Sequence, residues 1–562
     1  MREQDKVDAC GSACAEQSQP MRILHIGNIA NNAYLNAKLL QTGDVVNDVL
    51  SYSNYHIMTC FQWEEDLSLL NYAVTPEKLR LHARESRRQK PSWFRQGPLG
   101  AALYCLKEDK KTIFSRLLLK ETAFRTKIAS NEPFLESGTA KKFYQFMARR
   151  FSLLEKLALI QFVNTENRIE LYKGLLQRGL KREHLPERLR AILGYIYRQY
   201  LHWPLRCLAA FIIPFSPPPP SRPWRQQEII KLCESAEDAV DSRYYWQVEP
   251  PYWLRCLMSR VLDNYDVIIG YSTDGQWPWL VNKHPYCAFE HGTIRSIPFE
   301  NTFQGKLCKV TYQEADHVFI TNCDNITAAK TLELKNYCFV PHPINEDIPD
   351  WIEAHKLRLR LNSLYPADFW IFHPSRQHWE ERRHPSWEKG NDFLIRGMAE
   401  AVSQGLNVGA VFVDWGLFVK ESKALIDELG LTDRVVWIDP VPHPLMVEYI
   451  LATDCVADQF WLGAFGSTSP KALMLGRAAL IHLDEERHRW CLPELPPMIN
   501  VQKAGEIAAA LLRLHKDGAY RTEIESAGKE WYRKYHSNQA IRDIMLPVLN
   551  ALAQKKRATA AK

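Results

Sequence analysis

The C-terminal half of the chain alternates short apolar stretches with segments of helical composition, and this alternation limits the possible folds more than any other feature. We expect strands at Phe369–His373, Val408–Asp414, Val435–Ile438, Cys455–Phe460 and Ala478–Leu483. We expect helices at Asp392–Gln404, Val419–Leu429, Pro444–Ala452 and Pro470–Leu475. Strands that alternate with helices of this length form a parallel sheet with helices on both faces. The pattern therefore predicts an α/β domain.

The N-terminal half starts in the same way. Arg22–Ile26 is an apolar run, followed by the turn GNIANN and a helical segment, Ala33–Leu40. The turn lacks the GxGxxG fingerprint of a dinucleotide site. Further strands are expected at Ser51–Cys60, Tyr265–Gly270, Ala315–Thr321 and Tyr337–Val340, with a helix at Asn325–Glu333. A second α/β domain is therefore predicted.

A chain of 562 residues favours two or more domains. We expect a disordered leader at residues 1–20, an N-terminal domain at 21–343, a C-terminal domain at 344–535, and a last helix at 536–562. This helix is expected to cross back to the N-terminal domain, to kink at Pro547 and to end in a tail, QKKRATAAK, that is too polar to pack. Residues from about 64 to 246 are predicted to form a large, mostly helical insertion with a polyproline spacer.

Basic residues are concentrated in one segment. Residues 76–230 contain 30 Lys and Arg and 13 Asp and Glu, a net charge of +17 in a chain whose formal total is +6. Aromatic residues are interleaved with these charges. The segment suits an anionic membrane surface or an anionic glycan, and a solvated helical face is the alternative. Nucleic acid is not expected as a partner, because no nucleic-acid-binding motif accompanies the charge.

The cysteines and the hydropathy indicate a cellular compartment. Thirteen cysteines are scattered without a CxxC pair, which argues against a disulfide scaffold or a zinc ribbon and favours a reducing cytoplasm. The most apolar run, Leu208–Phe215, is too short to span a bilayer. We expect a cytoplasmic protein, and peripheral binding at the inner face of the membrane is a further expectation from the basic segment.

A glycine-rich loop, Gly463–Arg477, lies between two of the predicted strands of the C-terminal half. Gly463 and Gly466 precede Ser467 and Thr468, and Pro470 stands in the first turn of the next helix. Unpaired N–H groups at such a helix start bind anions, and glycines allow close approach of a phosphate. The alternative is that the glycines only shape a tight turn.

Two cationic residues follow the first strand of the C-terminal half. Arg376 belongs to HPSR, and Lys389 belongs to KGND at the start of the next helix. Arg offers a planar fork and Lys a point charge, and both suit the oxygens of a diphosphate. The turn DPVPHP, residues 439–444, is a rigid place where backbone groups meet a nucleotide base. His291, in AFEHGT, ends another strand; it either donates a hydrogen bond into a cleft or only caps the turn.

The motifs ADHVFIT and FVPHPI, SR and KGNDFLI, VVWIDPVPHPLMVEYILATDC and GAFGSTSPKALMLGR occur in this order. This order resembles that of the family-4-like retaining glycosyltransferases of GT-B fold (glycosyl transferases group 1). The resemblance covers about Tyr265 to Leu514, and Arg22–Leu40 weakly. It implies two facing Rossmann-like domains, of which the N-terminal one binds the acceptor and the C-terminal one binds a nucleotide sugar.

The resemblance also implies roles for single residues. Arg376 and Lys389 match the pair that holds the diphosphate, and His291 matches a histidine near the transferred sugar. The predicted donor site comprises Ser375, Pro440, Val441, His443, Gly463, Gly466, Ser467, Thr468 and Lys471. The predicted acceptor side of the cleft comprises Gly27, Asn28, Glu290 and Gly292. The family's two glutamates, which contact the donor sugar and the ribose hydroxyls, are replaced here by Gly463 and Lys471.

The charge reversal at Lys471 suggests a ligand. A lysine in the first turn of a helix opposes the helix dipole by some tenths of a kcal/mol unless an anion compensates it. We hypothesise contact with a donor phosphate or a uronic acid; a surface lysine is the alternative. No metal is expected, because the histidines lack ligand spacing on a helix and no Asp-x-Asp is present. Metal independence is also typical of the resembled fold, and no cofactor beyond the nucleotide-sugar substrate is expected.

These observations predict a metal-independent, retaining glycosyltransferase. It would move a sugar from a nucleotide diphosphate to a hydroxyl of a glycan or lipid-linked acceptor, in surface polysaccharide or glycoconjugate synthesis. One alternative is a nucleotide-sugar epimerase of the same fold, which would process the donor without an acceptor. Another is a glycan- or membrane-binding subunit that has lost catalysis, which the replaced glutamates favour and Arg376 and Lys389 oppose.

Overall fold

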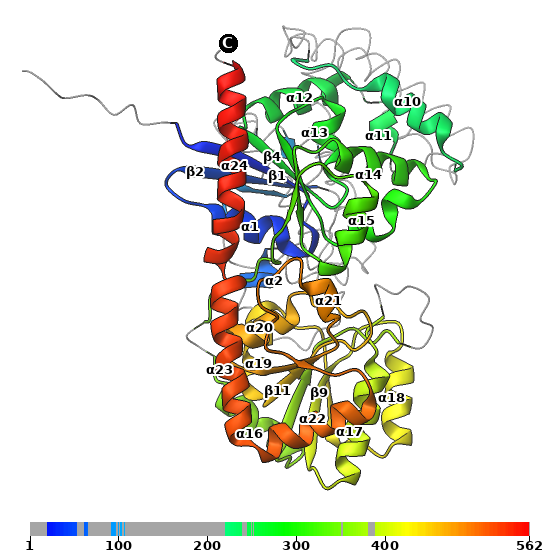
Figure 1. Cartoon of the computed structure of the whole chain (residues 1–562), viewed down its shortest axis with the longest axis vertical. Helices are drawn as coiled ribbons and strands as arrows, with labels where there is room; N and C mark the ends of the chain where they lie inside the picture. Colours follow the sequence, from blue (N-terminus) through cyan, green and yellow to red (C-terminus); the bar gives the residue numbers. More distant parts are fainter. Residues whose placement is uncertain are drawn as a thin grey trace, which may run out of the picture.

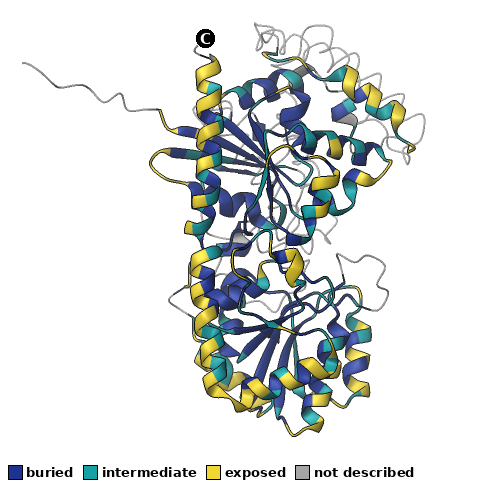
Figure 2. Ribbon diagram, viewed as in Figure 1, coloured by how far each residue is buried: buried dark blue, intermediate teal, exposed yellow. Residues whose placement is uncertain are grey.

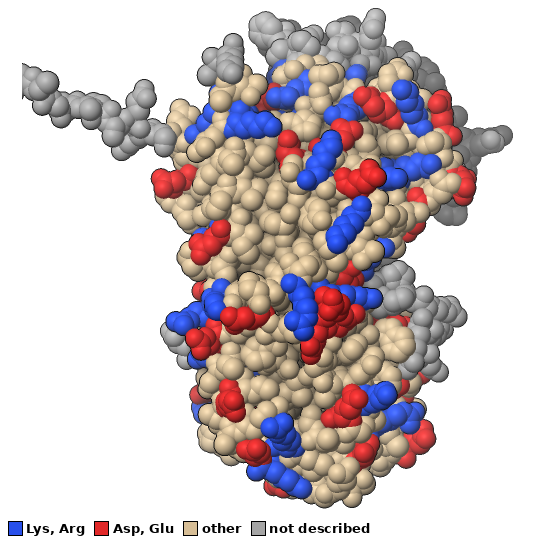
Figure 3. Space-filling model, viewed as in Figure 1, with Lys and Arg blue, Asp and Glu red and all other residues tan. Residues whose placement is uncertain are grey.

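The computed structural model describes residues 19–52, 61–65, 91–96, 99, 102–103, 106, 220–238, 244–248, 250, 252–349, 352–379 and 388–560. These residues form two lobes, stacked along the long axis and connected along one side by the last two helices (Figure 1). Most of the predicted leader, insertion and basic segment lies outside the described residues. On the visible face of the described part, basic and acidic side chains are interspersed (Figure 3).

The N-terminal lobe contains a seven-stranded sheet in the order β3-β2-β1-β4-β5-β6-β7, in which every pairing is parallel. The strands are β1 (Met21–Ile26), β2 (Val45–Ser51), β3 (Phe94–Gln96), β4 (Val267–Tyr271), β5 (Tyr286–Phe289), β6 (His317–Ile320) and β7 (Tyr337–Phe339). The main helices are α1 (Asn32–Leu40), α2 (Gln62–Glu65), α10 (Gln226–Ser235), α11 (Tyr245–Val248), α12 (Tyr252–Asp263), α13 (Gln276–Leu280), α14 (Phe303–Gln313) and α15 (Ile326–Thr331). Helices on both faces bury the sheet, which is dark blue in Figure 2.

The structure adds detail to two sequence predictions for this lobe. The strand β2 ends at Ser51, and most of the strand predicted at Ser51–Cys60 lies outside the described residues. Asn47 and Asp48 interrupt its apolar pattern, although Asn47 is buried and is bonded by His25. In addition, β3 lies inside the segment predicted as helical, where it forms the sheet edge beside β2.

The C-terminal lobe repeats the same topology with six strands, in the order β10-β9-β8-β11-β12-β13. The strands are β8 (Phe369–His373), β9 (Val408–Val413), β10 (Val435–Ile438), β11 (Cys455–Ala457), β12 (Ala478–Ile481) and β13 (Ile499–Asn500). The helices are α16 (Ala354–Leu364), α17 (Asn391–Ser403), α18 (Val419–Glu428), α19 (His443–Ala452), α20 (Thr468–Met474), α21 (Glu485–His488) and α22 (Ala504–Lys516). The five predicted strands are all present, although β11 ends at Ala457, before the predicted end at Phe460.

The chain then returns to the N-terminal lobe through α23 (Gly518–Tyr535) and α24 (Asn538–Ala560), with Pro547 inside α24. The apolar stripe of α24 packs on α1 and β4. The predicted tail is helical up to Ala560 and mostly exposed, but two of its basic side chains reach back to residues beside the sheet. Lys556 Nζ donates to the Tyr265 carbonyl over 2.7 Å, and Arg557 pairs with Asp266 at 2.9 Å.

Two Rossmann-like domains with such a returning helix form the GT-B architecture, so the predicted fold class is confirmed. The helical insertion predicted with it lies largely outside the described residues. No described helix is long and apolar enough to cross a membrane. The described cysteines are free thiols.

Buried histidines make the fold sensitive to acid. His25 is fully buried in β1, where its Nδ1 lies 2.8 Å from the Tyr271 hydroxyl, and burial lowers its pKa to about 4. Between pH 6.5 and 4 the unfolded chain therefore binds a proton that the folded chain refuses, and stability is lost as the pH falls. We expect the free energy of unfolding of His25→Gln to depend less on pH in this window. The wild-type protein should lose more of it than the variant, by about 3 kcal/mol at most. Denaturant titrations at pH 7 and 4.5 measure the free energy of unfolding of both proteins. An equal loss of this free energy between the two pH values would contradict the prediction.

Candidate functional site

The strand order of both sheets defines where a ligand fits. In each sheet the order of the strands along the chain reverses once, between β1 and β4 in the N-terminal lobe and between β8 and β11 in the C-terminal lobe. Ligands of such sheets bind beyond the carboxyl ends of the strands at this point. Elements that follow other strands of the two sheets pack together: α19, after β10, packs on α2, after β2, and α21, after β12, packs on the turn Cys323–Asn325, after β6. The candidate site is therefore the junction between the lobes.

Asp458 organises the C-terminal half of this site. It follows β11, is buried, and accepts hydrogen bonds from Ser375 Oγ at 2.9 Å and Ser469 Oγ at 2.7 Å. Ser375 comes from the loop after β8, and Ser469 comes from the first turn of α20. One carboxylate thus joins the two loops that were predicted to hold the donor.

Arg376 and Lys389 are the cations of this half. The Arg376 guanidinium lies 5.5 Å from the Trp415 ring centroid, and within the described residues it makes no hydrogen bond or ion pair. Lys389 Nζ donates to Gln459 Oε1. Burial lowers the pKa of Lys389 to about 8, Asp458 opposes this, and Arg376 and Arg295 lower it further. The two side chains therefore form a positive region where the strand order reverses between β8 and β11. A region of this charge suits a diphosphate.

The glycine loop takes the shape that its glycines allow. Gly463 has φ +75°, and a Cβ there would lie 2.9 Å from Asp484 Cβ, so no glutamate fits at this position. Gly466 has open space around it, and Ser467 is exposed at the start of α20. The backbone N–H groups of Gly466, Ser467 and Thr468 donate to no group in the described part of the chain. These donors remain available to an anion.

The remaining predicted donor residues are buried. Pro440, Val441 and His443 line the turn that starts α19, and His443 faces the N-terminal lobe, with Nδ1 4.0 Å from Glu64 Oε2. Lys471 is only 8% exposed, and burial lowers its pKa. It is therefore not the surface lysine that was the alternative prediction.

On the N-terminal side, Gly27 faces a carboxylate that sequence reasoning missed. Gly27 has φ +88°, and a Cβ there would collide with the side chain of Asp274, in the loop after β4. Asp274 accepts a hydrogen bond from the Tyr52 hydroxyl, and burial raises its pKa to about 7. Asn28 shapes the turn after β1 by accepting from the Tyr34 N–H at 2.9 Å. The strand predicted at Tyr265–Gly270, which is β4 in the structure, was the signal that could have led to Asp274. The loop after this strand lies beside the loop after β1, where the strand order reverses.

His291 is held as a neutral imidazole. Its Nδ1 lies 2.7 Å from Asn32 Nδ2, an amide donor, so the ring proton is on Nε2. Burial, and then the charge of Arg295, lower its pKa to about 4. Gly292 follows with φ +77°. Glu290 lies inward, fully buried, and accepts from Asn322 Nδ2 at 3.2 Å, so it supports the loop after β6.

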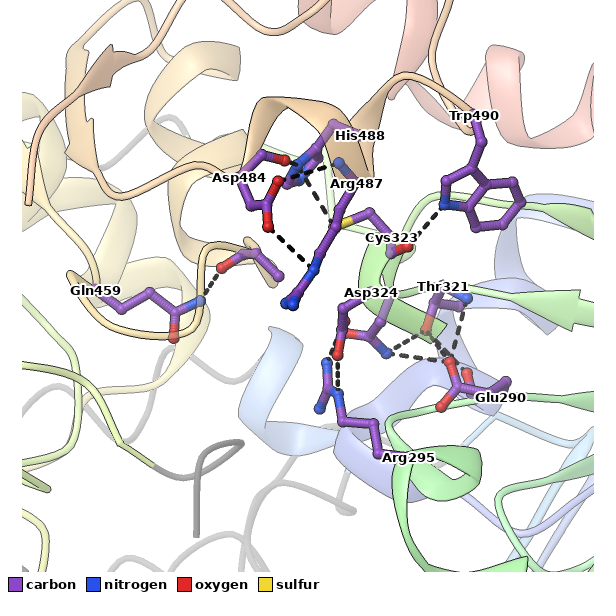
Figure 4. A network of polar contacts seen from close by, with 12 residues as sticks. Glu290, Arg295, Thr321, Cys323, Asp324, Gln459, Asp484, Arg487, His488 and Trp490 are labelled. Atoms are coloured by element: carbon purple, nitrogen blue, oxygen red, sulfur yellow. Dashed lines mark hydrogen bonds and ion pairs between the residues drawn. The ribbon is translucent and has the colours of Figure 1, made fainter. Parts of the chain in front are cut away.

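Side chains of both lobes face each other across the junction (Figure 4). Arg295 forms a bidentate pair with Asp324, with Nη2 2.8 Å from Oδ1. Cys323 Sγ lies 3.5 Å from His488 Nδ1, and Trp490 Nε1 donates to the Cys323 carbonyl at 2.7 Å. The two contacts of Cys323 hold α21 and the residues after it against the N-terminal lobe. Among the described residues, no group of three or more His, Cys, Asp or Glu side chains could hold a metal ion.

Comparisons with known proteins give similarities at the level of solved structures. No protein-family model and no curated protein matches the chain. Sucrose-phosphate synthase from Thermosynechococcus elongatus is 17% identical with a TM-score of 0.42, over 58% of this chain and 83% of that one. Anabaena Alr3699/HepE in complex with UDP-glucose is 17% identical with a TM-score of 0.42, over 59% and 98%. Trehalose 6-phosphate synthase from Burkholderia multivorans is 11% identical with a TM-score of 0.40, over 58% and 82%.

Proposed function

We propose that the protein is a glycosyltransferase that moves a sugar from a nucleotide diphosphate donor to an acceptor hydroxyl, with retention of configuration and without a metal ion. The observation that carries the proposal is the position of Arg376 and Lys389. Both lie where the strand order of the C-terminal sheet reverses, and the Arg376 guanidinium has no acidic partner among the described residues. Such a place suits the diphosphate of a donor.

The chemistry requires stabilisation of the departing diphosphate. Negative charge on the leaving group grows in the transition state, so contacts from Arg376, Lys389 and the N–H groups at the start of α20 strengthen there. The junction between the lobes removes the reacting groups from water, which strengthens each electrostatic contact.

The N-terminal lobe offers groups for the acceptor. His291 Nε2–H is a donor, and Asp274, with a pKa of about 7, is protonated in part at neutral pH and can both donate and accept. This combination suits a sugar or lipid-linked hydroxyl. Surface polysaccharide or glycoconjugate synthesis at the cytoplasmic face of a membrane fits this role, and the basic segment 76–230 would contact the anionic lipid.

Donor screening tests the proposal. A nucleotide sugar that binds only the folded state raises the unfolding temperature, and at a hundred times its Kd the stabilisation is about 2.7 kcal/mol. We expect one donor family to give this shift and to yield nucleoside diphosphate only when an acceptor is added. A new sugar formed from donor alone would indicate an epimerase. Absence of binding by any nucleotide would indicate a subunit without catalysis.

A further inference from the structure

A polar cavity lies at the end of the C-terminal lobe that is remote from the donor site. Its volume is about 380 Å³, and it is bounded by the start of α16, the end of α19, the residue before β12 and the first two turns of α23. Figure 1 shows α16 near the lower end of this lobe. Asp454 lines the cavity and precedes β11, whereas Asp458 of the candidate site follows the same strand. The cavity and the donor site therefore lie at opposite ends of one sheet.

Guanidinium groups outnumber carboxyl groups around this cavity. Arg358 of α16, Arg477 before β12 and Arg521 of α23 line it, together with the acids Asp454 and Glu525. Burial raises the pKa of Glu525, although Arg477 and Arg521 oppose this rise, so its carboxyl is protonated more easily than that of an exposed glutamate. The charged side chains therefore give the cavity an excess of positive charge.

Asp454 balances part of this charge. Its Oδ2 accepts hydrogen bonds from Arg358 Nη1 and from the Trp370 N–H, both at 2.7 Å, and its Oδ1 lies 3.4 Å from Arg521 Nη1. One carboxylate thus serves two guanidinium groups. Because a hydrogen bond of 3.4 Å is weak, Arg521 is the less firmly held of the two and is available to another anion.

Arg477 is held beside the cavity by backbone carbonyls. Its Nε donates to Thr453 at 3.0 Å, its Nη2 donates to Leu451 at 2.9 Å, and its Nη1 donates to Gly476 at 3.3 Å. These bonds satisfy carbonyls at the end of α19. Among the described residues, the guanidinium has no ion pair with a carboxylate within 4.0 Å. Its charge is therefore fixed in position without a counter-ion from the described part of the chain.

The other two arginines keep unused donors. Within the described ranges, Arg358 and Arg521 make their hydrogen bonds through Nη1, and no bond involves Nε or Nη2 of either side chain. The planar guanidinium fork binds two oxygens of one phosphate. An anion also relieves the repulsion between like charges that line one small space. The volume of the cavity lies in the range that small ligands occupy.

We propose that this cavity is a second anion site, which binds a phosphate group either as the free ion or as the monoester of a small organic molecule. Arg358 and Arg521 contact the phosphate oxygens, and Arg477 adds its charge. The site goes beyond the proposed function, since it requires no nucleotide. α16 is the first helix of the C-terminal lobe and α23 begins the return to the N-terminal lobe, so the bound phosphate connects the helices by which the chain enters and leaves this lobe.

Calorimetric titration of the full-length protein with inorganic phosphate and with glucose 6-phosphate, at constant ionic strength, tests the site. We expect saturable binding that Arg521→Gln weakens about tenfold, through the loss of one charged hydrogen-bonding group. Glu525→Gln should instead tighten binding about threefold, because it removes a like charge. Arg396→Gln is the matched control on the exposed face of α17 and should change the affinity less than twofold.

A second background separates this cavity from the donor site. The titrations are repeated in Arg376→Ala, which removes a cation of the donor site, and we expect the same affinity for phosphate at the cavity. Loss of phosphate binding in Arg376→Ala, together with wild-type binding in Arg521→Gln, would place the phosphate at the donor site and overturn the proposal. Melting curves of all variants show whether they fold. If Arg521→Gln does not fold, the sign of the change in Glu525→Gln decides.

The two probes distinguish the sources of the phosphate. Tighter binding of glucose 6-phosphate than of inorganic phosphate assigns the site to an organic monoester, and equal or weaker binding assigns it to the free ion. Absence of saturable binding by both probes would overturn the proposal. Equal weakening by Arg521→Gln and Arg396→Gln would also overturn it, because the effect would then come from the overall charge of the lobe.

Discussion

Arg376→Ala is expected to lower turnover roughly 100- to 1000-fold, which is the usual effect of removing one group that stabilises developing negative charge. The guanidinium makes no polar contact with the described residues, so its removal leaves no buried group unsatisfied there. The guanidinium lies over the face of Trp415, 5.5 Å from the ring centroid. The variant should therefore lose turnover and keep the unfolding temperature of the wild-type protein. Steady-state kinetics with the identified donor, and a melting curve of the variant, measure both quantities.

Two further variants make the Arg376 result specific. Arg376→Lys keeps the charge but loses the planar fork, and we expect an intermediate rate. Arg513→Ala is the matched control, because Arg513 also lies over a ring, that of Tyr520 at 3.5 Å, on α22 outside the site. A turnover of Arg376→Ala that equals that of Arg513→Ala would remove Arg376 from the site.

The sheets could be predicted from the sequence because their signals are local. The strand predicted at Phe369–His373 coincides with β8, since four of its five residues are apolar and all five are buried. The loops that follow the strands then meet because parallel strands end at one edge of a sheet. Arg376, Ser375 and Asp458 come together for this reason, although 83 residues separate the last two.

Other parts of the site depend on contacts that no local pattern records. Glu64 lies in a stretch that was predicted to belong to a helical insertion, and only the packing of α2 on α19 brings its carboxylate to 4.0 Å from His443 Nδ1. Asp274 gains its raised pKa from burial beside the Gly27 turn, and the hydrogen bond from Tyr52 opposes this rise. The conformation of Gly463 shows the same limit: the glycine is visible in the sequence, but the close approach of Asp484, which leaves no room for a side chain, is not.

Lys389 should make nucleotide binding depend on pH. Burial lowers its pKa to about 8, so in the free protein the ammonium loses its proton as the pH rises through 8. A bound diphosphate favours the charged form and raises this pKa, because opposite charges at short distance attract. Binding above pH 8 therefore requires uptake of a proton. We expect the affinity for the nucleoside diphosphate to be about tenfold lower at pH 9 than at pH 7. Calorimetric titration in buffers of different ionisation enthalpy measures both the affinity and the proton uptake.

Substitutions at Lys389 separate this charge from the other cations. Lys389→Ala should lose turnover on the scale of Arg376→Ala, because each removes one positive charge from the same diphosphate. Lys389→Arg should bind with little dependence on pH between 7 and 9, since a guanidinium stays protonated throughout. If the wild-type affinity is constant across this range, or if Lys389→Arg keeps the full pH dependence, Lys389 does not contact the phosphates. The positive field where the strand order reverses would then come from Arg376, with Lys389 serving only to position Gln459.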